Sequence, residues 1–186
     1  MCLTVIWKML KMEADVKNRI YSCERIYMLA IDQSGNKLLE FIKITEEDAA
    51  LQFSPITVCL LVVKIGKDYL MGFNHWRKGW EIFGGCPEEG ETMREAMVRE
   101  AKEELGIDCF PEWLGIAHFE MQPDYFSNVV REEYGAIFGI SLGEEYLTQI
   151  EKLRIDREEI EKIALLREIS SDEEIRELDR KLTEFY

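Results

Sequence analysis

Histidine and paired cysteine are both scarce in this 186-residue chain. It has two histidines and five cysteines, and no two cysteines have the C-x-x-C spacing of a zinc knuckle. The odd number and scattered positions of the cysteines also argue against a disulfide framework. We therefore expect free thiols in a reducing cytosol, and no histidine-rich zinc site.

Long apolar runs and basic residues are in short supply as well. The longest apolar stretch, Ile56–Ile65, is too short to span a membrane. With 23 basic and 37 acidic residues the net charge is −14, which argues against binding to nucleic-acid polymers or anionic membranes. A small phosphorylated substrate is still compatible with this charge, since a bound divalent metal can reverse the local field.

The order of strand and helix patterns predicts one α+β domain. Strand composition marks residues 26–31, 38–44, 56–65, 69–74, 80–85, 112–121 and 133–142. Helix composition marks residues 92–105 and 144–153, and the ambiguous segment 158–169 is assigned to a strand. No repeat and no Pro/Gly/Ser-rich linker interrupts the chain. We expect an α/β/α sandwich with a mixed β-sheet.

The two ends of the chain carry additional elements. Residues 1–24 are expected to form a poorly ordered arm or a dimer contact, so a homodimer is left open. Residues 25–52 read as an N-terminal β-hairpin extension, with turn chemistry in "DQSGN" and a short helical or loop link in "TEEDA". Ser171 with Glu174 predicts the cap of a C-terminal helix over 171–185. We treat 25–186 as a single domain.

A helix with two clear ends is expected at 92–105. Thr92 and Glu95 have the spacing of a capping box, and Gly106 supplies a C-terminal stop. This helix follows a Gly-Gly pair and is crowded with glutamates, which repel one another at helical spacing.

Three of these acids fall on one stripe of the helix. Glu104 lies about 40° from Glu100 on a helical projection, and Glu103 lies about 60° away on the other side. The stripe borders the apolar face, as the wall of a cleft would. Carboxylate oxygens alone suit a hard cation, Mg²⁺ or Mn²⁺, which would offset the repulsion. The competing interpretation is a solvated charged helix face.

The spacing around these acids decides between the two interpretations. Gly85, Glu91, Arg99-Glu100, Glu103-Glu104 and Gly106 fill every fixed position of G-x5-E-x7-R-E-U-x-E-E-x-G-U, where U is apolar. This pattern resembles the Nudix box, and the wider similarity covers about 53–169. The resemblance implies a Nudix-type α/β/α sandwich in which the box forms a loop, a helix and a second loop.

The resemblance also implies roles for the residues of the box. Glu100, Glu103 and Glu104 would bind the metal and carry the catalysis, with the Gly84 carbonyl as a further ligand. Glu100 or an additional acid would serve as the base. Glu91 and Arg99 would form a buried ion pair that fixes the loop on the helix.

Outside the box, several residues are candidates for substrate contact or for a fourth acid. Arg77 or Lys78 could contact phosphate and Trp76 could stack on a base, although a surface or packing role is an equally good interpretation. A fourth acid often assists in this family. The candidates for it are Glu132, Glu133, Glu144 and Glu145, with Glu120 and Asp124 as others.

The function implied is a Mg²⁺- or Mn²⁺-dependent Nudix pyrophosphohydrolase. Its substrate would be a nucleoside triphosphate, or a nucleoside diphosphate linked to another group, cleaved by metal-activated water. Two alternatives remain. One is a non-catalytic Nudix-fold sensor of a nucleotide or metabolite, and the other is an enzyme resembling the isoprenoid diphosphate isomerases.

Overall fold

A nine-stranded mixed sheet forms the centre of the computed structural model, which describes residues 29–125 and 127–186. The expected arm, 1–24, lies outside the described residues. The strands are β1 Ala30–Ile31, β2 Lys37–Ile42, β3 Val58–Ile65, β4 Asp68–Asn74, β5 Gly79–Glu81, β6 Phe83–Gly85, β7 Glu112–Met121, β8 Arg131–Leu142 and β9 Ile160–Leu165. The helices are α2 Glu46–Gln52, α3 Met93–Leu105, α4 Glu145–Leu153 and α5 Glu177–Leu182, with 3-10 turns η1 Leu166–Glu168 and η2 Thr183–Phe185.

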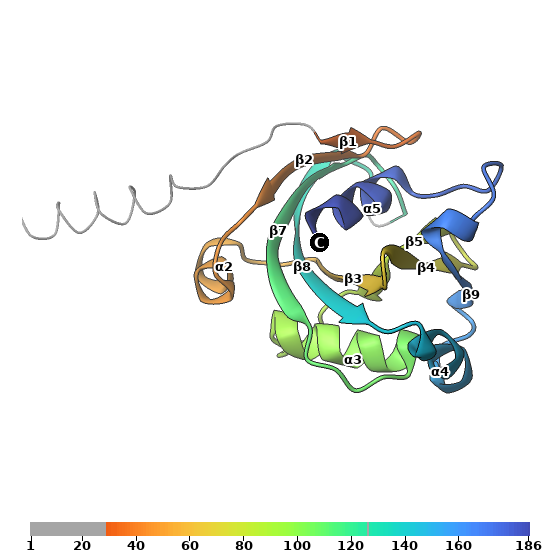
Figure 1. The fold of residues 1–186 in the computed structure, drawn as a ribbon. Helices are drawn as coiled ribbons and strands as arrows, with labels where there is room; N and C mark the ends of the chain where they lie inside the picture. The colour runs from red at the N-terminus through yellow and green to blue at the C-terminus, as the bar shows by residue number, and fades with distance from the viewer. Residues whose placement is uncertain (1–28, 126) are drawn as a thin grey trace, which may run out of the picture.

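The sheet has the order β1-β2-β7-β8-β3-β4-β5, while β6 pairs with β3 and β9 pairs with β4 (Figure 1). The β3–β8 pairing is parallel, and the other pairings between strands are antiparallel. β3, which is apolar except at Lys64, therefore lies in the interior of the sheet, as its composition predicts. The α+β class and the mixed sheet are confirmed.

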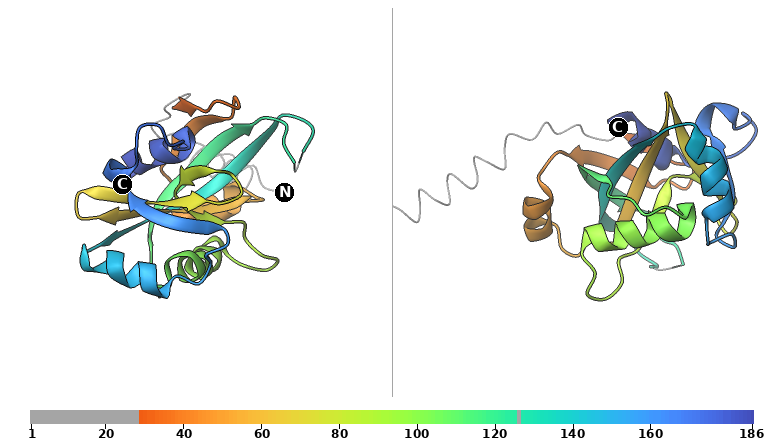
Figure 2. Two further views of the ribbon diagram at one scale, coloured as in Figure 1. Left: turned by 90° about the vertical axis from the view of Figure 1, so that its right-hand side faces the viewer. Right: turned by 60° about the horizontal axis from the view of Figure 1, so that its bottom comes forward.

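Helices cover both faces of this sheet. Ala96, Met97, Ala101 and Leu105 of α3 pack into the core on one face. Leu178 and Leu182 of α5 pack into a second core on the other face. Figure 2 shows from two further sides that α3 and α5 lie on opposite sides of the sheet. The sandwich of helix, sheet and helix that the sequence predicts is therefore present.

Several boundaries differ from the expected ones. The segment 80–85 is two short strands, because β5 pairs with β4 whereas β6 pairs with β3. The N-terminal hairpin is part of the main sheet, since β2 pairs with β7. Within the described residues, no helix is long and apolar enough to cross a membrane.

The start of the C-terminal helix was wrongly predicted. The α-helix begins at Glu177, with Arg176 as its N-cap residue, and not after Ser171. Trp80 holds residues 174–176 in a β-bridge: its backbone N–H donates to the Glu174 carbonyl, and its carbonyl accepts from the Arg176 N–H. This pairing with the backbone of β5 outcompetes the local capping signal.

Candidate active site

Helix α3 begins and ends where its sequence predicts. The Thr92 side chain accepts a hydrogen bond from the Glu95 N–H, and the Glu95 carboxylate accepts one from the Thr92 N–H, which completes the capping box. Gly106 adopts the left-handed conformation at the C-cap. The helix therefore has a fixed register, which decides where each of its glutamates lies.

Glu104 is buried against the glycine loop that precedes the helix. Its side chain accepts a hydrogen bond of 2.6 Å from the Gly84 N–H, and the residue is 4% exposed. Burial raises the pKa of Glu104 well above the usual glutamate value, although the Gly84 hydrogen bond opposes the rise. The carboxylates of Glu100, Glu159 and Glu81 raise it further, so negative charge converges at this point.

Glu100 lies on the other glycine of the pair. A Cβ on Gly85 would overlap the Glu100 carboxylate, so only glycine permits this close approach. The Arg99 Nη1 donates to Glu100 Oε1 at 2.7 Å. Burial raises the pKa of Glu100, Arg99 opposes the rise, and Glu103 and Glu159 add to it. Glu104 is thus bonded to the backbone of this loop, and Glu100 packs against it.

Backbone geometry explains why Gly84 itself is a glycine. Its φ is +132°, and a Cβ there would overlap the Cys59 carbonyl oxygen of β3. The pairing of β6 with β3 forces this approach, because Gly84 lies opposite Leu60 and Gly85 opposite Cys59. The loop is therefore pressed onto the central strand.

Arg99 joins the loop to the helix. Its Nε lies 2.9 Å from Glu91 Oε1, its Nη2 donates to Glu91 Oε2 at 3.1 Å, and Nη2 also donates to the Cys86 carbonyl. Glu103 lies 3.4 Å from Arg99 Nη1, and its side chain is 46% exposed. The three acids of the predicted stripe therefore differ: Glu104 is buried, Glu100 is nearly so, and Glu103 faces solvent.

An acid that the sequence analysis missed lies beside these residues. Glu159 directly precedes β9, and its charge raises the pKa values of both Glu100 and Glu104. Its own pKa is raised by burial, while Arg77 and a hydrogen bond from Asn74 oppose the rise. Glu159 lies in a run of charged residues with no distinctive spacing, so no local pattern marks it.

The segment before Glu159 is attached to the box helix. The N–H groups of Ile155 and Asp156 both donate to the Glu103 carbonyl, at 2.8 and 2.9 Å. The Asp156 side chain then accepts from the N–H groups of Glu158 and Glu159. Because the last turn of α3 fixes this loop, the position of Glu159 depends on the box helix.

The four acids first considered for this role have other contacts. Glu132 lies 3.1 Å from His118, and Glu133 contacts Thr57 and Arg131. The Glu144 side chain lies near Gly66, and Glu145 lies near Gly143. The two further candidates are also paired: Glu120 forms an ion pair with Lys37, and Asp124 forms one with Arg131.

The β4–β5 turn carries the candidate substrate contacts. Arg77 directs its guanidinium at Glu81, with Nη1 2.9 and 3.0 Å from the two carboxylate oxygens. Lys78 Nζ lies 3.4 Å from the His75 ring, and Trp76 is 64% exposed. Arg77 is therefore engaged by a carboxylate, whereas Trp76 is accessible to a ligand.

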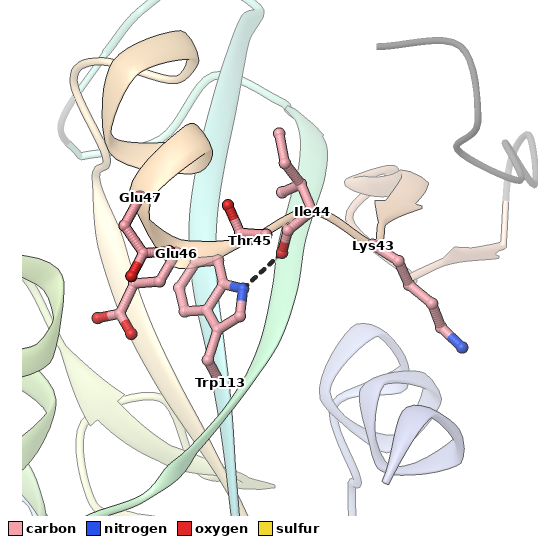
Figure 3. A pocket seen from close by; sticks show the side chains of 6 residues that line it. All are labelled: Lys43, Ile44, Thr45, Glu46, Glu47 and Trp113. Carbon is pink, nitrogen blue, oxygen red and sulfur yellow. Dashed lines mark hydrogen bonds between the residues drawn. The ribbon is translucent and has the colours of Figure 1, made fainter. Parts of the chain in front are cut away.

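One hollow of the surface lies away from these residues. Figure 3 shows Trp113 beneath the start of α2, where its Nε1 donates to the Ile44 carbonyl at 2.7 Å. Lys43, Thr45, Glu46 and Glu47 also line this space of about 610 Å³. None of these residues belongs to the box.

The donor set fits a hard cation. Glu100, Glu103, Glu104 and Glu159 offer oxygen atoms only, and the glycine pair leaves room for carboxylates against the backbone. The pKa values of Glu100 and Glu104 are raised first by burial and then by neighbouring carboxylates, and a bound cation would offset both effects. In the described part of the chain, no three acidic, histidine or cysteine side chains are already placed so that together they could hold a metal ion.

Comparison with known proteins identifies the family of the chain. The NUDIX domain model matches residues 56–185, so the chain belongs to the Nudix family. The pyrophosphohydrolase BsRppH of Bacillus subtilis is similar in structure, with a TM-score of 0.57 and 19% identity over 86% of this chain and 97% of that one.

A second similar structure is the NUDIX domain of Shewanella oneidensis NrtR complexed with ADP ribose. Its TM-score is 0.53 and its identity 12%, over 76% of this chain and 96% of that one. At such identities both likenesses concern the fold alone. No curated protein matches the sequence significantly.

Proposed function

We propose that this chain is a Nudix pyrophosphohydrolase that uses Mg²⁺ or Mn²⁺ to cleave a diphosphate linkage in a nucleotide-type substrate. The observation that carries the proposal is the convergence of Glu100 and Glu104 on the Gly84-Gly85 loop. Two carboxylates buried together against a backbone are costly unless a cation completes the group.

The residues divide into three roles. Glu100, Glu103, Glu104 and the Gly84 carbonyl hold the cation, while Glu159 acts as the fourth acid. Arg99 and Glu91 keep the loop on the helix, as their paired distances of 2.9 and 3.1 Å support. A bound cation supplies charge neutralisation for the diphosphate and acidity for the attacking water.

A carboxylate then accepts the proton of the attacking water. Glu100 and Glu159 both have pKa values raised by burial, which makes them stronger bases than an exposed glutamate. Arg99 already donates to Glu100, whereas Asn74 donates to Glu159. The pH profiles of Glu100→Gln and Glu159→Gln distinguish them, because loss of the base removes the acidic limb of kcat.

The substrate is proposed at the level of chemical class. A polyphosphate approaches a chain of net charge −14 only with cations present. Trp76, with its exposed ring, is a candidate to stack on a base, and Lys78 is the accompanying candidate cation.

The deciding experiment is a substrate panel with product identification by mass spectrometry. Nucleoside triphosphates, ADP-ribose, nucleotide sugars and dinucleoside polyphosphates are incubated with the full chain and Mg²⁺ or Mn²⁺. We expect cleavage between two phosphates, lost on addition of EDTA. Tight calorimetric binding without turnover would favour a ligand sensor, and an isomeric product would favour isomerase chemistry.

A further inference from the structure

Asn74, the last residue of β4, is a fully buried amide between two carboxylates. It has no exposed surface, and its Nδ2 donates to Glu81 Oε1 at 2.8 Å and to Glu159 Oε1 at 3.0 Å. An amide nitrogen carries two hydrogens, and each has a carboxylate to bond. Asn74 therefore keeps two negative side chains at fixed positions near each other.

The other half of the amide holds the β4–β5 turn. Asn74 Oδ1 accepts from the N–H groups of Trp76 and Arg77, at 2.9 and 3.0 Å. The oxygen thus organises the turn locally, whereas the nitrogen reaches Glu159, 85 positions away in the sequence. The two atoms have separable tasks, and a substitution can remove one and keep the other.

The two carboxylates depend on Asn74 to different degrees. Glu81 also receives Arg77 Nη1, and Arg176 Nε lies 3.7 Å from it. Within the described residues, the Glu159 carboxylate accepts its side-chain hydrogen bond from Asn74. Loss of the Nδ2 donor should therefore release Glu159 while Arg77 retains Glu81.

We propose that Asn74 is a positioning residue that holds the Glu159 carboxylate toward the box acids Glu100 and Glu104. This inference rests on the proposed function. Asn74 contacts neither substrate nor cation, and it acts through the direction that it imposes on Glu159. Loss of a side chain that orients a metal-binding carboxylate by a hydrogen bond weakens metal binding about 10- to 100-fold.

The experiment measures Mn²⁺ binding to the full chain, by electron paramagnetic resonance of the free ion and by calorimetry. Asn74→Asp keeps the oxygen that accepts from the turn, but it replaces the donor with an oxygen that repels both Glu81 and Glu159. We expect this variant to bind Mn²⁺ about tenfold more weakly than the wild type. Asn128→Asp, an exposed site with the same change in charge, should bind like the wild type.

The double variant Asn74→Asp/Glu159→Gln tests whether Asn74 acts through Glu159. The amide introduced at position 159 would donate to the carboxylate introduced at position 74, so the hydrogen bond is restored with reversed polarity. The double variant should recover the part of the thermal stability that is lost through repulsion of Glu159, because the new carboxylate still faces Glu81. It should bind Mn²⁺ no more weakly than Glu159→Gln alone. Additive losses, or wild-type Mn²⁺ affinity in Asn74→Asp, would overturn the proposal.

Folding failure is also informative. If Asn74→Asp unfolds and Glu159→Gln rescues it, the two side chains interact as proposed. If both the single and the double variant unfold, Asn74 is a folding residue and the inference is wrong. Wild-type Mn²⁺ binding that Glu104→Gln weakens and Asn74→Asp does not would overturn this inference alone. Absence of Mn²⁺ binding to the wild type would overturn the proposed function with it.

Discussion

The acids of the site come from two regions that differ in how their sequence relates to their structure. The box segment, residues 84–106, is contiguous, and the side-chain hydrogen bonds within it join residues at most 20 positions apart, such as Gly84 with Glu104. The Asn74 network, defined as Asn74, Arg77, Glu81, Glu159, Arg176 and Asp179, joins β4, β5, the start of β9 and α5. The box segment can be recognised from the spacing of its residues in the sequence. The residues of the Asn74 network come together only when the sheet forms.

Glu104→Gln should have the largest effect, since it removes a buried charge from the box segment. The loss of cation binding should reduce kcat about a thousandfold, because metal stabilisation of the transition state is worth several kcal/mol. Steady-state kinetics over a range of Mg²⁺ concentrations provide the measurement.

Glu89→Gln is the matched control, an exposed acid in the same loop. It should keep wild-type kcat. Equal rates for Glu104→Gln and wild type would remove Glu104 from the mechanism and leave the box segment a structural motif.

Substitutions at two glycines of the box segment should separate an effect on cation binding from an effect on the stability of the fold. Gly85→Ala places a methyl group against the Glu100 carboxylate, so Mn²⁺ affinity should fall about tenfold, as for a displaced ligand. Gly90 has φ +89° and nothing near its missing side chain, so Gly90→Ala should cost about 1–2 kcal/mol of stability.

Calorimetry with Mn²⁺ and urea unfolding of both variants make the comparison. Gly90→Ala should bind Mn²⁺ like the wild type. If Gly85→Ala also binds normally, Glu100 does not need its present position for the cation.

In the Asn74 network, Glu159→Gln should reduce kcat about tenfold. This loss is smaller than that expected for a box acid, because Glu159 adds a fourth acid to a site that the box residues already form. Glu132→Gln is the comparison, because Glu132 was a predicted fourth acid and its recorded contact is with His118. Kinetics at several Mg²⁺ concentrations separate a binding defect from a chemical one. A larger loss of kcat in Glu132→Gln than in Glu159→Gln would make Glu132 the fourth acid in place of Glu159.

This contrast explains what the sequence could predict. The capping box at Thr92, the stop at Gly106 and the ends of β7 agree with the sequence analysis, because local chemistry determines each of them. Glu159 was missed because its position comes from backbone hydrogen bonds between the 155–156 segment and the Glu103 carbonyl. No local pattern encodes a contact of that range.

The same limit applies to α5 and to Asn74. A sequence places Ser171 and Glu174 at capping distance, but it does not show that Trp80 pairs with the backbone of Glu174 and Arg176. In the sequence, Asn74 is indistinguishable from any polar residue before a turn. Its contact with Glu159 arises because β9 pairs with β4. Residues whose role depends on strand order therefore require the structure.

The smallest expected effect is a pH dependence at the α5 end of the Asn74 network. Burial raises the pKa of Asp179 from its ordinary value to about 7, and the nearby Glu81 carboxylate adds to the rise. Arg176, Arg77 and a hydrogen bond from the Ile82 backbone oppose it. The folded state therefore favours the protonated acid. Its contribution to stability is present below the ordinary pKa and is lost as pH rises through about 7.

Asp179→Asn removes this titration and keeps the shape of the side chain. Relative to wild type, the variant should gain unfolding free energy between pH 5 and pH 8, as measured by urea denaturation. Asp172→Asn is the control, because its exposed carboxyl has a lowered pKa and stays ionised over this range. A constant difference between Asp179→Asn and wild type would mean that Arg176 keeps Asp179 ionised, and that the network remains a fixed set of ion pairs throughout.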